Sequence, residues 1–200
     1  DSVASRGLGD VYKRQATSAT SIAENAGTSL TLTATLSGAT DQNVTVVLGT
    51  SGTATEGTDY TDGSGNVDDI TISAGSTTGT VSFTPTDDSV YEGNETATIA
   101  ISSVTGEASE SGTQAVTITI TENESAPTVT LYMKIASLGF EYISTSISEA
   151  YSSTSIRIEA KLSGATDEDV TVALSTSGTA TEGTDYTCLL YTSPSPRDAT

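Results

Sequence analysis

The stretch ITISAGSTTGTVSFTPTDDSVYEGNETATIAI, residues 70–101, carries two patterns that together indicate a fold. Apolar residues alternate with Thr, Ser and Ala at 70–72, 81–83 and 97–101, and a period of two is typical of half-buried β-strands. The connection TDDSVYEGNE, residues 86–95, brings four carboxylates close together along the chain. The sequence therefore predicts strands here, with an acidic loop between two of them.

The same alternation continues on both sides of this stretch. Gly, Asp and Asn separate the apolar runs, which is the turn chemistry expected between short strands. The pattern over residues 16–126 predicts an all-β fold, an immunoglobulin-like antiparallel β-sandwich of about seven strands. Burial of Ile, Val and Leu from both inner faces would supply its core, at roughly 1.5–3 kcal/mol for each side chain. The outlying apolar runs contain Leu30, Leu32, Ala34, Leu36, Val44, Val46, Leu48, Val116, Ile118 and Ile120.

The two ends of the chain differ from everything between them. SRGLGDVYKRQ (residues 5–15) can be back-translated so that its reverse complement, shifted by one nucleotide, encodes CLLYTSPSPR (residues 188–197). We therefore interpret residues 1–15 and 188–200 as adapter-derived peptides of a sequencing library, not as biological sequence, and set them aside. This also removes Cys188, the one cysteine, so no cysteine chemistry is expected.

A long tandem repeat organises the interior. LSGATDQNVTVVLGTSGTATEGTDYT (36–61) recurs as LSGATDEDVTVALSTSGTATEGTDYT (162–187) with four differences. We predict one sandwich over residues 16–126 and the N-terminal part of a second, truncated repeat over 127–187. Glu149 and Asp185 match Glu24 and Asp59, but the later acidic positions have no counterpart. We therefore expect the second repeat to fold poorly and to form only a weak version of any site that the acids of the first repeat make. Residues 131–143 read as an insertion that forms an extra strand or hairpin.

Charge is the strongest constraint on function. The formal net charge is -19, and residues 16–187 hold 23 carboxylates against Lys134, Arg157 and Lys161. No basic residue occurs over 16–133, so side-chain salt bridges cannot neutralise the acids of the first repeat. Such a surface repels nucleic acid and anionic lipid, and no apolar run is long enough to insert into a membrane.

A bound cation is the remaining way to compensate converging carboxylates. Calcium takes six to eight oxygen ligands in flexible geometry, whereas zinc or copper would favour His or Cys, which residues 16–187 lack. Without a cation, neighbouring carboxylates raise one another's pKa values. The alternative is that the acids of 86–95 are solvated loop residues that keep the domain soluble.

Four segments in combination resemble the Calx-β domain, a calcium-binding sandwich of sodium/calcium exchangers, integrin β4 and bacterial surface proteins. They are SIAEN (21–25), GTATEGTDYT (52–61), the stretch 70–101, and VTITITENE (116–124). The resemblance implies calcium at one end of the sandwich, held by acids from strand ends and loops. Asn123 stands where exchanger-type members have a central aspartate, which implies one to three ions. The implied ligands are Glu24, Asp59, Asp87, Asp88, the backbone carbonyl of Val90, Glu92, Glu95, Glu122, Asn123 and Glu124.

Other signals carry less information. DGSGNVDD (62–69) begins like an EF-hand loop but has Val67 where that loop needs glycine, so we interpret it as a hairpin turn. Glu56 and Asp41 are expected to be solvated turn residues. Tyr60 and Tyr91, which both lie beside acidic positions, are expected to pack over the end of the sandwich rather than to bind a ligand.

Three functional classes follow. The leading hypothesis is a calcium-binding tandem-repeat module of a large extracellular or cell-surface, adhesin-like protein, whose partners are neighbouring repeats and a cell-surface or matrix ligand. The alternative is a regulatory calcium sensor of a membrane exchanger, and a lesser one is a metal-free soluble spacer. The absence of Trp and His disfavours a carbohydrate-cleaving enzyme, so we expect no catalytic residues and no enzymatic activity.

Overall fold

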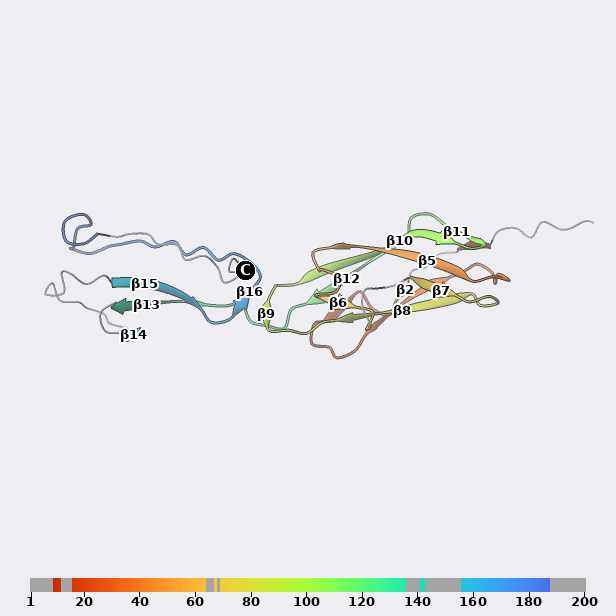
Figure 1. Cartoon of the computed structure of the whole chain (residues 1–200), viewed down its shortest axis with the longest axis horizontal. Coiled ribbons are helices and arrows are strands. Elements are labelled where there is room, and N and C mark those ends of the chain that lie inside the picture. The colour runs from red at the N-terminus through yellow and green to blue at the C-terminus, as the bar shows by residue number, and fades with distance from the viewer. Residues whose placement is uncertain are drawn as a thin grey trace, which may run out of the picture. The chain divides into compact units, whose positions relative to one another are not determined.

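The computed structural model describes residues 9–11, 16–63, 67, 69–135, 141–142 and 156–187. Its described elements are strands (Figure 1). In these residues, no helix is long and apolar enough to cross a membrane. The strands are β1 (Gly9–Val11), β2 (Ala16–Thr17), β3 (Ser21–Ala23), β4 (Leu30–Thr35), β5 (Val44–Gly52), β6 (Tyr60–Thr61), β7 (Ile70–Ile72), β8 (Thr78–Pro85), β9 (Val90–Tyr91), β10 (Glu95–Thr105), β11 (Ala108–Glu110), β12 (Ala115–Thr121), β13 (Val129–Ile135), β14 (Glu141–Tyr142), β15 (Ile156–Leu162) and β16 (Ala165–Thr166).

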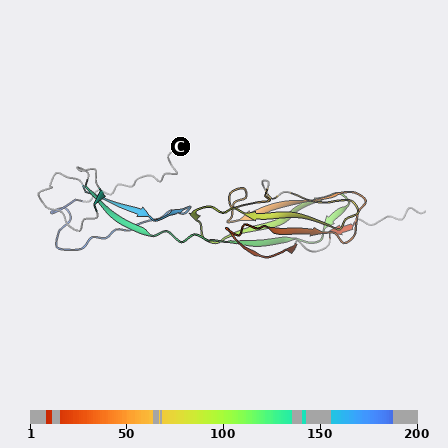
Figure 2. The ribbon, with the colours of Figure 1, turned by 90° about the horizontal axis from the view of Figure 1, so that it is seen from below.

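Two sheets form the first repeat, and their strands lie along one common axis (Figure 2). One sheet has the order β3-β12-β10-β5-β7 and the other β2-β4-β8-β6. Neighbours are antiparallel except β3 and β12, which pair in parallel. The predicted all-β sandwich is confirmed. Gly9–Val11, which lie in the segment set aside above, pair with β11.

The alternation seen in the sequence becomes the core. In β4, Leu30, Leu32 and Ala34 are buried while Thr31 is exposed, so one face of the strand points inward. Tyr60 is 1% exposed and stacks on Phe83 with ring centroids 4.6 Å apart. Tyr60 therefore packs in the sandwich, as the sequence predicted. Residues 64–66 and 68 of the predicted hairpin turn lie outside the described residues.

The second repeat contains a smaller sheet with the order β14-β13-β15. β13 and β14 pair in antiparallel fashion where they lie in residues 131–143, the segment that the sequence marks as an insertion. β16 follows β15 and pairs in parallel with β9. The described residues 170–187 belong to a separate compact unit. There the described chain repeats a local turn, with a Glu182–Tyr186 bridge that matches Glu56–Tyr60.

Gly52 lies where β5 and β10 approach each other closely, and substituting it tests the effect of that approach on stability. Its φ is +134°, and a Cβ at this position would overlap the carbonyl oxygen of Thr96. We expect Gly52→Ala to lower the free energy of unfolding of the first repeat by more than about 2 kcal/mol, measured by chemical denaturation. Gly178 is the matched control, because it has a φ of +131° in the same sequence context but nothing within 4 Å of its Cβ position. An equal loss in Gly178→Ala would contradict this account.

Candidate metal centre

The directions of three strands bring distant acids to one end of the sandwich. β3 and β12 run in parallel, with Ile22 opposite Ile120, so the residues that follow them emerge side by side. β10 runs antiparallel to β12 and begins with Glu95, opposite Ile120. The residues after β3, those after β12 and the start of β10 therefore meet at the same end.

The other sheet delivers its acids to this end as well. β6 and β8 are antiparallel, with Tyr60 opposite Pro85. The backbone amide of Thr86 donates a hydrogen bond of 2.9 Å to the carbonyl oxygen of Asp59, which lies just before β6. Asp59 is thus fixed next to the acidic loop that leaves β8.

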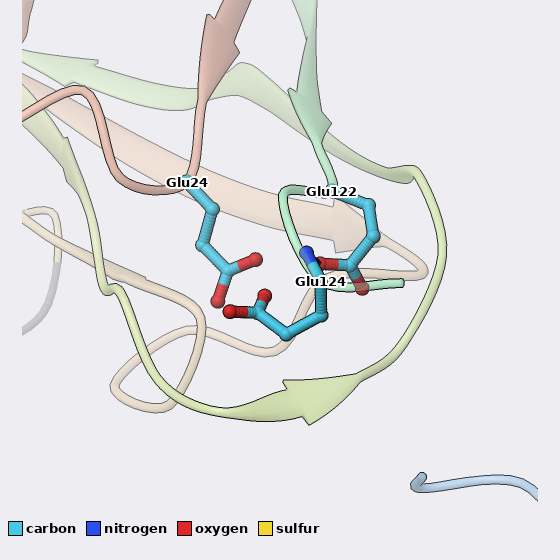
Figure 3. Close-up of side chains that lie close together, drawn as sticks. All are labelled: Glu24, Glu122 and Glu124. Carbon is cyan, nitrogen blue, oxygen red and sulfur yellow. Dashed lines mark hydrogen bonds between the residues drawn. The ribbon is translucent and has the colours of Figure 1, made fainter. Parts of the chain in front are cut away.

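Glu24, Glu122 and Glu124 form the first acidic group, shown in Figure 3. Each contributes a carboxylate oxygen, and the three oxygens lie within 4.8 Å of one another. Glu24 is 7% exposed, and among the described residues it is the one charged side chain that is buried. Burial, together with the charges of Glu122 and Glu124, raises the pKa of Glu24 to about 7, despite a hydrogen bond donated by the Asp88 amide. Without a cation, this carboxyl is partly protonated at neutral pH.

Glu122 is stabilised as an anion by the backbone. One carboxylate oxygen accepts the amides of Glu92 and Gly93, at 2.6 and 2.9 Å. The other accepts the amides of Asn123 and Glu124, at 2.7 and 2.9 Å. Burial alone would raise the pKa of Glu122, but the hydrogen bonds outweigh it and lower the pKa to about 2. Glu122 therefore ties the loop after β9 to the residues after β12.

Glu124 has an oxygen that the protein does not satisfy. Its Oε1 accepts a hydrogen bond of 2.8 Å from the side-chain amide of Asn123. Its Oε2 is buried and has no hydrogen-bond partner. The pKa of Glu124 is raised first by the close approach of its side chain to the carboxylate of Glu122, and further by burial and by the charges of Glu122 and Asp87. A buried anionic oxygen without a donor is costly, so this atom fits a cation ligand.

Asp59, Glu92 and Glu95 form the second acidic group, again with one oxygen from each within 4.8 Å of the others. Asp59 also accepts the amide of Thr55 at 2.6 Å, which closes the turn before β6. Burial comes first among the causes that raise the pKa of Glu95 to about 7, followed by the charges of Asp59 and Glu92. The pKa of Glu92 is raised in the same way, by burial and then by the charge of Asp59.

The four other implied ligands lie around these groups. The backbone amide of Asp88 donates a hydrogen bond to Glu24. The side chain of Asp88 accepts a hydrogen bond of 2.6 Å from the amide of Val90. The charge of Asp88 acts on Glu24 and Glu92, and that of Asp87 acts on Glu124. Asn123 holds Glu124 through its side chain. That the backbone carbonyl of Val90 is a metal ligand stays a prediction.

The sequence analysis misjudged one acid and missed another. Glu56 is not a solvated turn residue, because its carboxylate accepts the amide of Val67 at 2.6 Å and the hydroxyl of Thr50 at 3.1 Å. The sequence reasoning missed Asp167, whose charge contributes to the raised pKa values of Glu92 and Glu95. Its counterpart in the first repeat is Asp41, which instead contacts Glu107, so the sequence contained no signal for this position.

The comparison with protein families identifies the class. The Calx-beta domain model matches residues 15–124 and again residues 134–192, which together make up most of the chain. The chain therefore belongs to the Calx-beta domain family, as its motifs suggested. No curated protein is significantly similar in sequence.

Solved structures of Calx domains are similar to part of the chain. The crystal structure of CBD12 from CALX1.2 has 22% identity and a TM-score of 0.42, covering 50% of this chain and 40% of that one. The apo-form Calx CBD1 domain has 20% identity and a TM-score of 0.43, covering 53% of this chain and 89% of that one. The match thus spans less than half of the CBD12 structure.

The raised pKa values predict a pH dependence for the metal-free protein. A carboxyl whose pKa rises from 4.5 to about 7 on folding, as for Glu24 and Glu95, favours the folded state below pH 4.5. That contribution is lost as the pH rises through about 7. The two pKa shifts together correspond to several kcal/mol, and solvent screening reduces this, so we expect chelator-treated protein to lose roughly 2 kcal/mol of stability between pH 5 and pH 8, measured by urea unfolding. Glu24→Gln should flatten this slope, and an unchanged slope in that variant would contradict the assignment.

Glu122 and Glu124 should behave differently without metal. Glu122→Ala leaves four backbone amides without their acceptor, so we expect it to destabilise the chelator-treated protein by about 2–4 kcal/mol. Glu124→Gln removes a charge from a crowded anionic site and should be neutral or stabilising under the same conditions. Thermal unfolding of both variants checks this contrast. If the two variants were destabilised equally, the four hydrogen bonds from backbone amides to Glu122 would not be what stabilises this loop.

Proposed function

We propose that the first repeat binds calcium at this end of the sandwich. The observation that carries the proposal is the buried Oε2 of Glu124, without a donor, in a group of three carboxylates. The donor set contains only oxygen, which calcium prefers and which zinc or copper would not select. Membership in the Calx-beta domain family supports the same assignment.

The two acidic groups divide the proposed ligands. Glu24, Glu122 and Glu124, with Asp87 and Asp88 beside them, would hold one cation. Asp59, Glu92 and Glu95 would hold another, and we keep the range of one to three ions. A bound cation would supply charge compensation, because it takes the place of the protons that otherwise reside on Glu24 and Glu95.

Our proposal for the biological role is a structural module of an extracellular or cell-surface, adhesin-like protein. Near-identical tandem copies support it, because recent duplication lengthens a stalk. Calcium at the end of a repeat would fix the loops that face its neighbour. Weak sites suffice outside cells, with dissociation constants on the order of 0.1–1 mM. The proposal includes no enzymatic activity. A regulatory sensor of an exchanger would instead need micromolar affinity.

Calcium-dependent thermal unfolding of the full chain tests the proposal. Binding to the folded state alone stabilises it by about 1.4 kcal/mol at ten times the dissociation constant and about 2.7 kcal/mol at a hundred times. We expect the melting temperature to rise with calcium and to respond little to magnesium. The concentration at which the response begins separates an extracellular stalk from an intracellular sensor.

Matched variants make the test specific. Glu24→Gln and Glu95→Gln should raise the stability of chelator-treated protein near pH 8 and yet reduce the response to calcium. Glu107→Gln is the control, because Glu107 lies beyond the other end of β10, at least about 30 Å along the strand from Glu95. The control should respond to calcium like the parent chain. A flat response in the parent chain would leave the metal-free spacer as the function.

A further inference from the structure

A short segment of the second repeat pairs with the acidic loop of the first. β16 is parallel to β9, with Thr166 opposite Tyr91. The residues that follow two paired parallel strands emerge side by side, so Asp167 comes next to Glu92. Both strands belong to the same compact unit of the chain. The pairing therefore brings a carboxylate of the second repeat to the acidic end of the first.

The start of the second repeat holds this segment in place. The backbone amide of Ser163 donates a hydrogen bond of 3.0 Å to the carbonyl oxygen of Thr128. The amide of Thr128 in turn donates one of 2.9 Å to the hydroxyl of Ser163. Residues 125–127 separate Thr128 from Glu124 of the first acidic group. The residues that lead into β16 are thus tied to the linker that leaves the acidic end.

Asp167 lies beside the second acidic group, formed by Asp59, Glu92 and Glu95. Its Oδ1 atom is buried. Burial is the first cause that raises the pKa values of Glu92 and Glu95, and the charge of Asp167 adds to both shifts. Asp167 is not one of the three acids whose oxygens lie within 4.8 Å of one another, so it stands at the border of the group. A fourth carboxylate is therefore held next to three others.

Repulsion between these carboxylates opposes the arrangement. β9 and β16 contain two residues each, and so short a pair of strands contributes little stability in water. Like charges at close range weaken it further. A cation among the carboxylates reverses the sign of their interaction, because the four acids then become ligands of one ion. The pairing of β9 with β16 should accordingly depend on that ion.

The equivalent residue of the first repeat lies at the opposite end of its sandwich. Asp41 ends the segment LSGATD, as Asp167 does. The backbone amide of Gly75 donates a hydrogen bond of 2.8 Å to the carbonyl oxygen of Thr40. Gly75 precedes β8, whose other end, at Pro85, adjoins the acidic groups. An aspartate in this position can serve the acidic end of a preceding repeat but not that of its own.

We propose that Asp167 is a calcium ligand of the second acidic group, supplied by the second repeat to a site of the first. This rests on the calcium binding proposed above and adds a ligand from outside the first repeat. Asp59, Glu92 and Glu95 supply the other carboxylates, and these leave room for Asp167, because calcium accepts six to eight oxygens. The ion then joins the two repeats directly, in place of acting only on the loops of one.

Hydrogen exchange of backbone amides in the full chain, followed by mass spectrometry, tests the proposal. Exchange is compared in chelator and in about 10 mM calcium, roughly ten times the weakest dissociation constant expected. In the parent chain, calcium should slow exchange at least about tenfold in residues 86–95 and in residues 163–169. In Asp167→Asn, the protection of 86–95 should remain and that of 163–169 should be lost. Asp41→Asn is the matched control and should behave like the parent.

Calorimetric titration of calcium separates a ligand from a residue that only positions β16. Asp167→Asn should weaken one class of site at least about fivefold, and Asp41→Asn should leave the affinities unchanged. The weakening should persist in about 1 M salt, which screens a charge that acts through solvent. Unchanged affinity in Asp167→Asn, or a weakening that disappears in salt, would overturn the proposal.

The outcomes also distinguish this proposal from the one on which it rests. If calcium protects neither segment of the parent chain, the first repeat binds no calcium and both proposals fail. If calcium protects residues 86–95 but not 163–169, the calcium site stands and the ligand from the second repeat is wrong. The same conclusion follows if the protection of 163–169 survives in Asp167→Asn.

Discussion

The convergence of carboxylates in a domain without cationic side chains is the constraint on which the rest of the structure depends. Strand directions bring the acids together, because β3 and β12 end, and β10 begins, at the same end of the sandwich. Residues 16–126 contain no Lys, Arg or His to oppose them. The protein compensates in two ways: four backbone amides surround Glu122, and the pKa values of Glu24 and Glu95 are raised to about 7, mainly by burial. A calcium ion would be the third.

These two forms of compensation have different consequences for function. Glu122 is an anion at any physiological pH, so it can attract a cation without first losing a proton. Glu24 and Glu95 must be deprotonated before they can bind one, and this couples metal binding to pH. The loop between β9 and β10 is tied to Glu122 through its amides and also contributes Glu92 to the second acidic group. The two groups are thus connected by the same short loop.

The two repeats show how one sequence behaves in two tertiary contexts. The turn before β6 closes with a hydrogen bond from the amide of Thr55 to Asp59, and the same bond recurs from Thr181 to Asp185, at 2.6 and 2.7 Å. Gly57 and Gly183 also share a positive φ, of 83° and 86°. The apolar positions do not repeat in this way, since Leu32 is buried and Ile158 is open. The turn needs only its own residues, whereas burial needs a second sheet.

The sequence by itself determined the strands, the all-β class, the acidic character of one end and the residue types available to a metal. Period-two alternation, turn residues and composition are local properties, so they can be read without a structure. Only the tertiary structure decided that the acids form two groups, that Glu122 is held by amides, that Oε2 of Glu124 lacks a donor, and that Glu56 holds a loop. It also decided that Ile158 is exposed where Leu32, its equivalent in the first repeat, is buried. These features depend on distances between residues far apart in the chain and on burial, and neither is encoded in any short segment.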